Sequence, residues 1–171
     1  MVKVKTMKKL KLKSKVNYNP GLAALEMFQY DRFHKLTKDT YLYLDPKDDF
    51  LHSQCALLCC VTKMNYIDGN LVNLIVFDSK FLTCPKSIKE FFVNHEMGHV
   101  INKDHDNPKY KQEKLLRLFG FLPEMEVNAD LFAASVMGTD KVKNIIKYLI
   151  TNSDLPLSTK FELFRRYTRI K

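Results

Sequence analysis

The sequence predicts an α+β fold with one globular domain. Stretches that alternate apolar and polar side chains, as half-buried strands do, lie before residue 80. Apolar residues at helical spacing, bounded by helix start and stop signals, dominate from residue 85 onward. At 171 residues the chain is long enough to bury one core without disulfides. We therefore expect a lysine-rich arm or edge strand over residues 1–15 and a single domain over residues 16–171.

The net charge of +9 is concentrated in the first fifteen residues. Seven of the 28 lysines and arginines lie there without any acidic residue, so the rest of the chain has 21 basic and 19 acidic side chains. The VKVKT stretch alternates like a strand, and lysines on an edge strand block edge-to-edge aggregation. Binding of nucleic acid or of an acidic partner by this arm is an alternative that we do not favour.

Membrane segments and disulfides are not expected. No stretch has the ~18 consecutive apolar residues of a membrane span, and the first fifteen residues lack the apolar core of a signal peptide. These features predict a cytoplasmic protein without membrane insertion. Cys55, Cys59, Cys60 and Cys84 show no C-x-x-C spacing, so we expect buried thiols and not disulfides or metal ligands.

Four elements are expected before residue 80. Apolar residues recur at helical spacing from Leu22 to about Lys35, which predicts a first helix. TYLYLD then predicts a short strand. Asp68-Gly69 predicts a hairpin turn between the strands CALLCCVTK and LVNLIVFD. An edge strand at this place could pair with an extended peptide.

Four helices are expected after residue 85. Ser87 and Glu90 are spaced as a capping box at the start of the first helix. Gly98 in the same helix has no side chain, which would let another element approach closely. The other three predicted helices run from near Pro123 to Gly138, from Asp140 to Ile150, and from near Ser158 to the end.

The strongest chemical signal is the sequence His95-Glu96-Met97-Gly98-His99. Histidines four residues apart on a helix lie one turn above each other, so both imidazoles can reach a single metal ion. Glu96 faces the same open site, where it would act as the general base. Composition alone gives this pattern by chance roughly 0.006 times in such a chain. The motif therefore predicts a zinc-dependent hydrolase.

A hydrolytic zinc centre usually takes three protein ligands, so a third must come from elsewhere in the chain. One candidate is His105, at the metzincin spacing H-E-x-x-H-x-x-G-x-x-H, with Asn102 in place of glycine. The SVM triplet at residues 135–137 would then be a Met-turn. The other candidate is Glu126, for which Glu124 is a weaker substitute.

Glu126 is favoured because the alanine-rich helical pattern around it continues unbroken to Gly138 and leaves no reversal for a Met-turn. Asp130 lies one helical turn after Glu126 and on the same face. From there it would accept a hydrogen bond from the outer nitrogen of a ligand histidine. The predicted metal ligands are His95, His99 and Glu126.

HEMGHVINKDH followed by EVNADLFAASVMG resembles the gluzincin-type zincin metallopeptidases, in which H-E-x-x-H precedes an E-x-x-A-D helix. Small bacterial and phage domains of the ImmA/IrrE and HtpX type are similar. The resemblance covers about residues 70–150. It implies a minimal zincin fold, in which a small mixed or antiparallel sheet packs on the active-site helix and the ligand helix follows.

The resemblance also implies a zinc metalloendopeptidase that acts on a protein or peptide substrate. Glu96 would take a proton from a zinc-activated water and pass it to the leaving amine. An oxyanion donor is expected among Tyr110, Tyr148, His105, Arg165 and Arg166. The alternatives are a metzincin-like peptidase that uses His105, and a non-catalytic, metal-stabilised binding module whose basic arm binds nucleic acid or an acidic partner.

Overall fold

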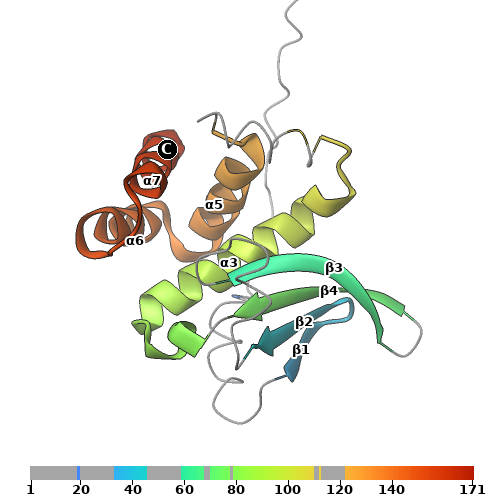
Figure 1. Ribbon diagram of the computed structural model, residues 1–171. Coiled ribbons are helices and arrows are strands. Elements are labelled where there is room, and N and C mark those ends of the chain that lie inside the picture. Colours follow the sequence, from blue (N-terminus) through green and yellow to red (C-terminus); the bar gives the residue numbers. More distant parts are fainter. Residues whose placement is uncertain are drawn as a thin grey trace, which may run out of the picture.

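The computed structural model describes residues 19, 33–45, 59–67, 70–77, 79–109, 112 and 122–171. Its strands are β1 (Phe33–Thr37), β2 (Thr40–Leu44), β3 (Cys59–Ile67) and β4 (Asn70–Phe77). Its helices are the short 3-10 turns η1 (Ser79–Thr83) and η2 (Asp104–Asp106) and the α-helices α3 (Lys86–Asn102), α5 (Glu124–Met137), α6 (Thr139–Asn152) and α7 (Leu157–Arg169). Strands are followed by helices, so the predicted α+β class is confirmed (Figure 1).

The four strands form one mixed sheet in the order β1-β2-β4-β3. β4 lies inside the sheet, where it pairs parallel with β2 and antiparallel with β3. Val72, Ile75, Val76 and Phe77 of β4 are buried, as expected of a strand that is covered on both faces. The predicted β3–β4 hairpin is confirmed by this pairing, while its Asp68-Gly69 turn lies outside the described residues.

Two expectations about the first half of the chain are wrong. The helix predicted to reach Lys35 does not extend there, because Phe33–Thr37 forms β1 and pairs antiparallel with β2. Pairing with a neighbouring strand overrides the helical spacing of these residues. The rest of that predicted helix and the VKVKT strand lie outside the described residues. β4 is also not an edge strand, so the edge just upstream of α3 is β3.

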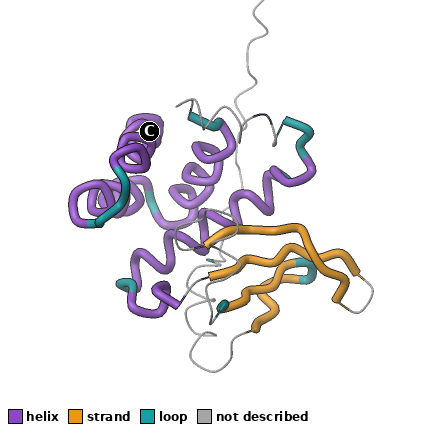
Figure 2. Tube along the Cα trace, in the orientation of Figure 1, coloured by secondary structure: helices purple, strands orange, loops and turns teal. Residues whose placement is uncertain are grey.

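Helix α3 lies between the sheet and the other long helices, which gather on the same side of the sheet (Figure 2). Val93 and Met97 pack with buried residues of β1, β2 and β4 in one core cluster. Ile88 and Phe91 pack with residues of α5, α6 and α7 in a second cluster. Phe92 is partly buried and contacts both clusters. Both cores therefore hold α3 in place.

The start of α3 differs from the predicted capping box. The helix begins at Lys86 with Pro85 as its N-cap, and no side chain caps it. Glu90 instead accepts hydrogen bonds at 2.7 Å from Asn19 Nδ2 and from Lys141 Nζ of α6. A charge-assisted hydrogen bond from lysine and a second one from an amide satisfy both oxygens of the buried Glu90 carboxylate, which explains why Glu90 turns away from Ser87.

Gly98 allows α5 to cross α3 closely, as predicted. A Cβ atom added at Gly98 would lie 2.7 Å from the Cα atom of Ala129. The predicted helices of the second half are confirmed, with Gly138 ending α5 at φ 94°, a conformation that favours glycine.

Within the described ranges, no helix is long and apolar enough to cross a membrane. Cys84 is partly buried and forms no disulfide; the other three cysteine side chains lie outside the described part.

Candidate metal centre

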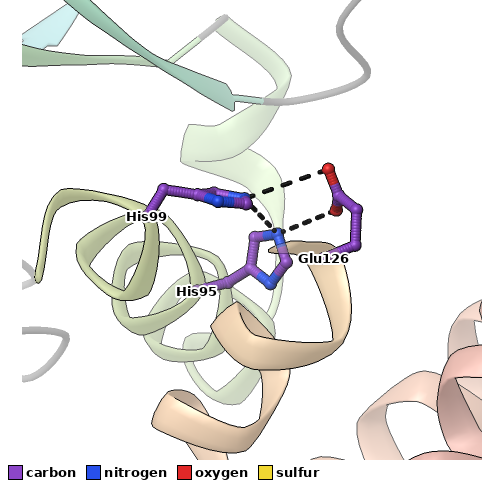
Figure 3. Close-up of side chains that lie close together, drawn as sticks. All are labelled: His95, His99 and Glu126. Carbon is purple, nitrogen blue, oxygen red and sulfur yellow. Dashed lines mark hydrogen bonds and ion pairs between the residues drawn. The ribbon is translucent and has the colours of Figure 1, made fainter. Parts of the chain in front are cut away.

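His95 and His99 lie one turn apart on α3, and the two residues are only 5% and 7% exposed. Their Nε2 atoms are 3.3 Å apart, and their rings are perpendicular to each other. Figure 3 shows the two imidazoles turned toward a common point beside the start of α5. The helical spacing of the motif therefore produces the expected pair.

Glu126 reaches this pair from the first turn of α5 (Figure 3). Its Oε2 atom is 3.3 Å from His95 Nε2, and its Oε1 atom is 3.9 Å from His99 Nε2. Among the described residues, His95, His99 and Glu126 form the group whose ligand atoms could hold a metal ion. The three side chains that the sequence predicted as ligands thus lie together.

Asp130 supports His95 from behind. Its Oδ1 atom is 2.9 Å from His95 Nδ1, and its side chain is completely buried. A carboxylate can only accept a hydrogen bond, so the Nδ1 atom of His95 carries the hydrogen and donates it. The Nε2 atom, on the other side of the ring, faces His99 and Glu126. This is the contact that the spacing of Glu126 and Asp130 predicted.

Asp104 plays the same part for His99, and sequence reasoning missed it. Its Oδ2 atom is 2.7 Å from His99 Nδ1, and the residue is 5% exposed. Lys103 ends α3 in the left-handed conformation, with φ 56°, which turns the chain so that Asp104 returns to the helix. An acidic residue directly after the end of the motif helix was a signal that could have suggested this contact.

Arg166 of α7 is the second residue that the sequence did not place. Its Nε and Nη2 atoms each donate to Asp130 at 2.7 Å, and its Nη1 atom donates to Glu126 Oε2 at 3.1 Å. It was expected only as one of several oxyanion donors. The guanidinium is buried and bound to two carboxylates, so it is not placed to meet a substrate.

Hydrogen bonds and nearby charge favour the ionised forms of Glu126 and Asp130 in the folded protein. Burial opposes ionisation of Glu126, but the hydrogen bond from His95 and the charge of Arg166 hold its pKa well below the usual value. For Asp130, burial is likewise outweighed by Arg166, and the pKa is lowered. The centre therefore presents negative charge and imidazole nitrogens to one point.

His95 holds a proton strongly when no metal competes for it. Burial and the nearby Arg166 guanidinium oppose protonation, yet hydrogen bonds to Asp130 and Glu126 raise the pKa of His95 to about 9. A proton on Nε2 then lies between His95 and Glu126, where a metal ion would otherwise lie. Any metal that binds here must displace this proton.

Glu96 lies on α3 between the two histidines and is 6% exposed. His105 follows in η2 and does not belong to the three-residue group. Burial and the charge of His99 lower the pKa of His105, while nearby Glu96 opposes this shift. The Met-turn expected for a metzincin is wrong, because residues 135–137 are the last residues of helix α5. A continuous helix cannot make the sharp reversal that such a turn needs.

The remaining oxyanion candidates are scattered. Tyr148 lies on α6 with 48% of its surface exposed, and Arg165 of α7 lies over the ring of Phe161. Tyr110 lies outside the described residues.

No protein-family model, curated protein or solved structure matches the chain. The resemblance to gluzincin-type peptidases therefore remains a prediction that depends on the two motifs.

Proposed function

We propose that the chain is a zinc-dependent metallopeptidase, with His95, His99 and Glu126 as ligands and Glu96 as general base. One observation carries the proposal: three ligand atoms from two helices converge on one point, and each histidine is turned toward it by a buried carboxylate. With both Nδ1 atoms donating to aspartates, the two Nε2 atoms and the Glu126 carboxylate face one another. Once the proton on His95 Nε2 is displaced, all three groups are acceptors, and a metal ion can bind between them.

The donor set and its spacing favour zinc. Two imidazole nitrogens and one carboxylate oxygen are the ligands of many hydrolytic zinc sites, which leave a fourth position open. A tetrahedral zinc ion with bonds of roughly 2.0–2.1 Å separates its ligand atoms by about 3.3 Å. The Nε2 atoms of His95 and His99 are 3.3 Å apart, as are His95 Nε2 and Glu126 Oε2.

When bound, zinc would supply Lewis-acid chemistry by acidifying a water and polarising the scissile carbonyl. Glu96 is the group on this chain that would move the proton. It lies directly after His95 and is almost completely buried. Bulk water is therefore largely excluded and does not compete with Glu96 for the transferred proton. It would accept a proton from water and release it to the leaving amine.

Strand β3 offers a way to hold an extended peptide. Within the described sheet it is an edge strand that pairs only with β4, and helix α3 packs beside it. A peptide that added to this edge would be bound through its main chain and would run past α3. This supports an unfolded segment or flexible loop of a protein as the substrate, and a single amino acid would gain nothing from this edge.

The experiment compares Glu96→Gln with Glu124→Gln, a matched change at an exposed glutamate of α5. Zinc content and cleavage of an unfolded protein are measured with added zinc and, separately, with chelator. We expect Glu96→Gln to retain zinc and the fold but to lose activity about 10²–10⁴-fold. Full cleavage by this variant would refute the assigned base. Zinc binding without any cleavage by the unaltered protein would favour the metal-stabilised binding module.

The ligand set is tested by metal analysis of Glu126→Ala and His105→Ala. Glu126→Ala should lose most of its zinc because one of three ligands is gone, whereas His105→Ala should retain it. The opposite result would favour the metzincin-like ligand set, in which His105 binds the metal.

A further inference from the structure

The buried arginine of the C-terminal helix lies between two acidic residues that meet the histidines. Arg166 is 6% exposed, although it lies on a helix whose Leu157, Phe161 and Phe164 are exposed. Its guanidinium binds both oxygens of Asp130 at 2.7 Å and Glu126 Oε2 at 3.1 Å. It also lies 3.8 Å from Glu162, one turn earlier on α7. Four carboxylate oxygens on three side chains thus surround one cation.

This arrangement answers an electrostatic problem created by the ligand helix. Glu126 and Asp130 lie one turn apart on the same face of α5, and like charges at this spacing repel each other. Both are buried or nearly so, which strengthens the repulsion. A guanidinium that donates to both carboxylates at once removes this repulsion and fixes their directions, because its donors form a rigid planar fork.

The fixed directions are those that a metal ion needs. Asp130 uses Oδ1 for His95 Nδ1 and for Arg166 Nη2, and it uses Oδ2 for Arg166 Nε. Its plane is therefore set by the arginine, and the ring of His95 follows it. Glu126 has Oε2 held by Arg166 Nη1, while Oε1 faces His99. Each carboxylate can turn away only by breaking a charged hydrogen bond.

We propose that Arg166 is a positioning residue of the metal centre, through which helix α7 orients both Glu126 and Asp130 and so raises metal affinity. This inference rests on the proposed zinc site. It makes the C-terminal helix a part of that site, although none of its residues is a ligand. Arg166 does not contact the substrate, because its nitrogens are buried against carboxylates.

The test uses Arg166→Gln and Arg166→Lys, with Arg165→Gln as the matched control. Arg165 directly precedes Arg166 on α7 and carries the same charge, and its guanidinium carbon lies 6.0 Å from the ring centroid of exposed Phe161. Zinc affinity is measured by competition with a chromogenic chelator, and the absorption spectrum of the cobalt-loaded protein reports ligand geometry. Unfolding of the metal-free variants by urea is followed in parallel.

We expect Arg166→Gln to lose about 10 to 100-fold in zinc affinity, as is usual when a partner of a metal ligand is removed. Its cobalt spectrum should change, which a loss of stability alone would not cause. Arg166→Lys keeps the charge but not the planar fork, so it should fold and recover only part of the affinity. Arg165→Gln should bind zinc within about twofold of the unaltered protein. Zinc affinity is expected to fall only when a residue that holds a metal ligand or its hydrogen-bond partner is replaced.

Two results would overturn the inference, and they differ from each other. If the unaltered protein binds zinc and folded Arg166→Lys or Arg166→Gln has the same affinity and cobalt spectrum, the positioning role is wrong while the proposed function stands. If the unaltered protein binds neither zinc nor cobalt, the proposed function fails and the inference fails with it. Should Arg166→Gln not fold, Arg166→Lys decides alone.

Discussion

The two histidines of the motif lie one turn apart on one helix, yet their supporting carboxylates come from very different places. His99 is held by Asp104, five residues further along the chain. His95 is held by Asp130, 35 residues away, which in turn is held by Arg166, 36 residues beyond it. One support forms as soon as α3 ends, whereas the other requires that α3, α5 and α7 pack together.

One half of the centre thus depends on local chain geometry, and the other half depends on tertiary packing of the helices. The pair of His99 and Asp104 needs only the left-handed turn at Lys103. The pair of His95 and Asp130 depends on the close crossing at Gly98 and on the burial of Arg166. We therefore expect changes in helix packing to affect the His95 side of the centre first. Glu126 belongs to that side, because it comes from α5 and also contacts Arg166.

The largest expected difference is between Asp130→Ala and Asp104→Ala. Asp130→Ala leaves the buried Arg166 without its two-bond acceptor and should lower the free energy of unfolding by about 3–5 kcal/mol. Asp104→Ala leaves one imidazole N–H without its partner and should cost about 1–3 kcal/mol. Urea unfolding of the metal-free proteins at pH 7 measures both. Equal costs would mean that the two supports are equivalent.

The pH dependence of zinc affinity is the next test. Zinc must displace the proton that His95 holds with a pKa of about 9, so apparent affinity should rise about tenfold per pH unit up to that value. Asp130→Asn removes a carboxylate that favours this proton, so the rise should end at a lower pH. Asp104→Asn should leave the end of the rise unchanged.

The proton on His95 makes the stability of the metal-free protein fall as the pH rises, whereas zinc affinity increases. A raised pKa stabilises the fold fully below the unfolded value of 6.5, and this contribution is lost as the pH rises to about 9. The urea midpoint of the metal-free protein should therefore fall over this interval. The zinc-loaded protein, in which the proton has been displaced, should lack this decrease. A midpoint that stays level without metal would contradict the proton's place between His95 and Glu126.

Gly98→Ala tests the helix crossing on which the His95 side depends. The new Cβ atom would lie 2.7 Å from the backbone of Ala129, so α5 must move. We expect a loss of about 1–3 kcal/mol in unfolding free energy, together with weaker zinc binding because Glu126 moves with α5. Asn128→Ala, at an exposed position of α5, is the control. Unchanged zinc binding by a destabilised Gly98→Ala protein would separate the crossing from the ligand geometry.

The smallest expected effect concerns the His99 side. Lys103 has φ 56°, which costs a non-glycine residue free energy, so Lys103→Gly should stabilise the fold by about 0.5–1 kcal/mol. Thermal unfolding measures the gain. Zinc affinity should stay the same, since the turn that brings Asp104 to His99 is kept. A marked loss of affinity would show that the lysine side chain itself contributes to the centre.

Much of the centre was predictable from the sequence because its spacing is local. Four residues make about one helical turn, which places His99 above His95 and Asp130 beside Glu126. Asn102 and the SVM triplet suggested a metzincin, but the helical pattern up to Gly138 argued correctly against a Met-turn. From residue 40 onward, the order of strands and α-helices followed from the same periodicities.

Other parts could not be predicted, because they depend on which elements meet in space. Helical spacing predicted a helix as far as about Lys35, but hydrogen bonds to β2 make Phe33–Thr37 a strand. Strand β4 is central and β3 is at the edge because β2 pairs parallel with β4 across a long connection. Glu90 is spaced as a helix cap, yet it binds Lys141 of a distant helix.

The sequence by itself determined the pair of histidines, the glutamate between them and the spacing of Glu126 and Asp130. Helical periodicity sets these relations, and they hold wherever the two helices lie. Only the tertiary structure decided that the two helices cross at Gly98 and that Arg166 of α7 closes the centre from behind. The physical reason is that a buried charge takes its partner from whichever element packs against it, and no periodicity along the chain encodes that choice.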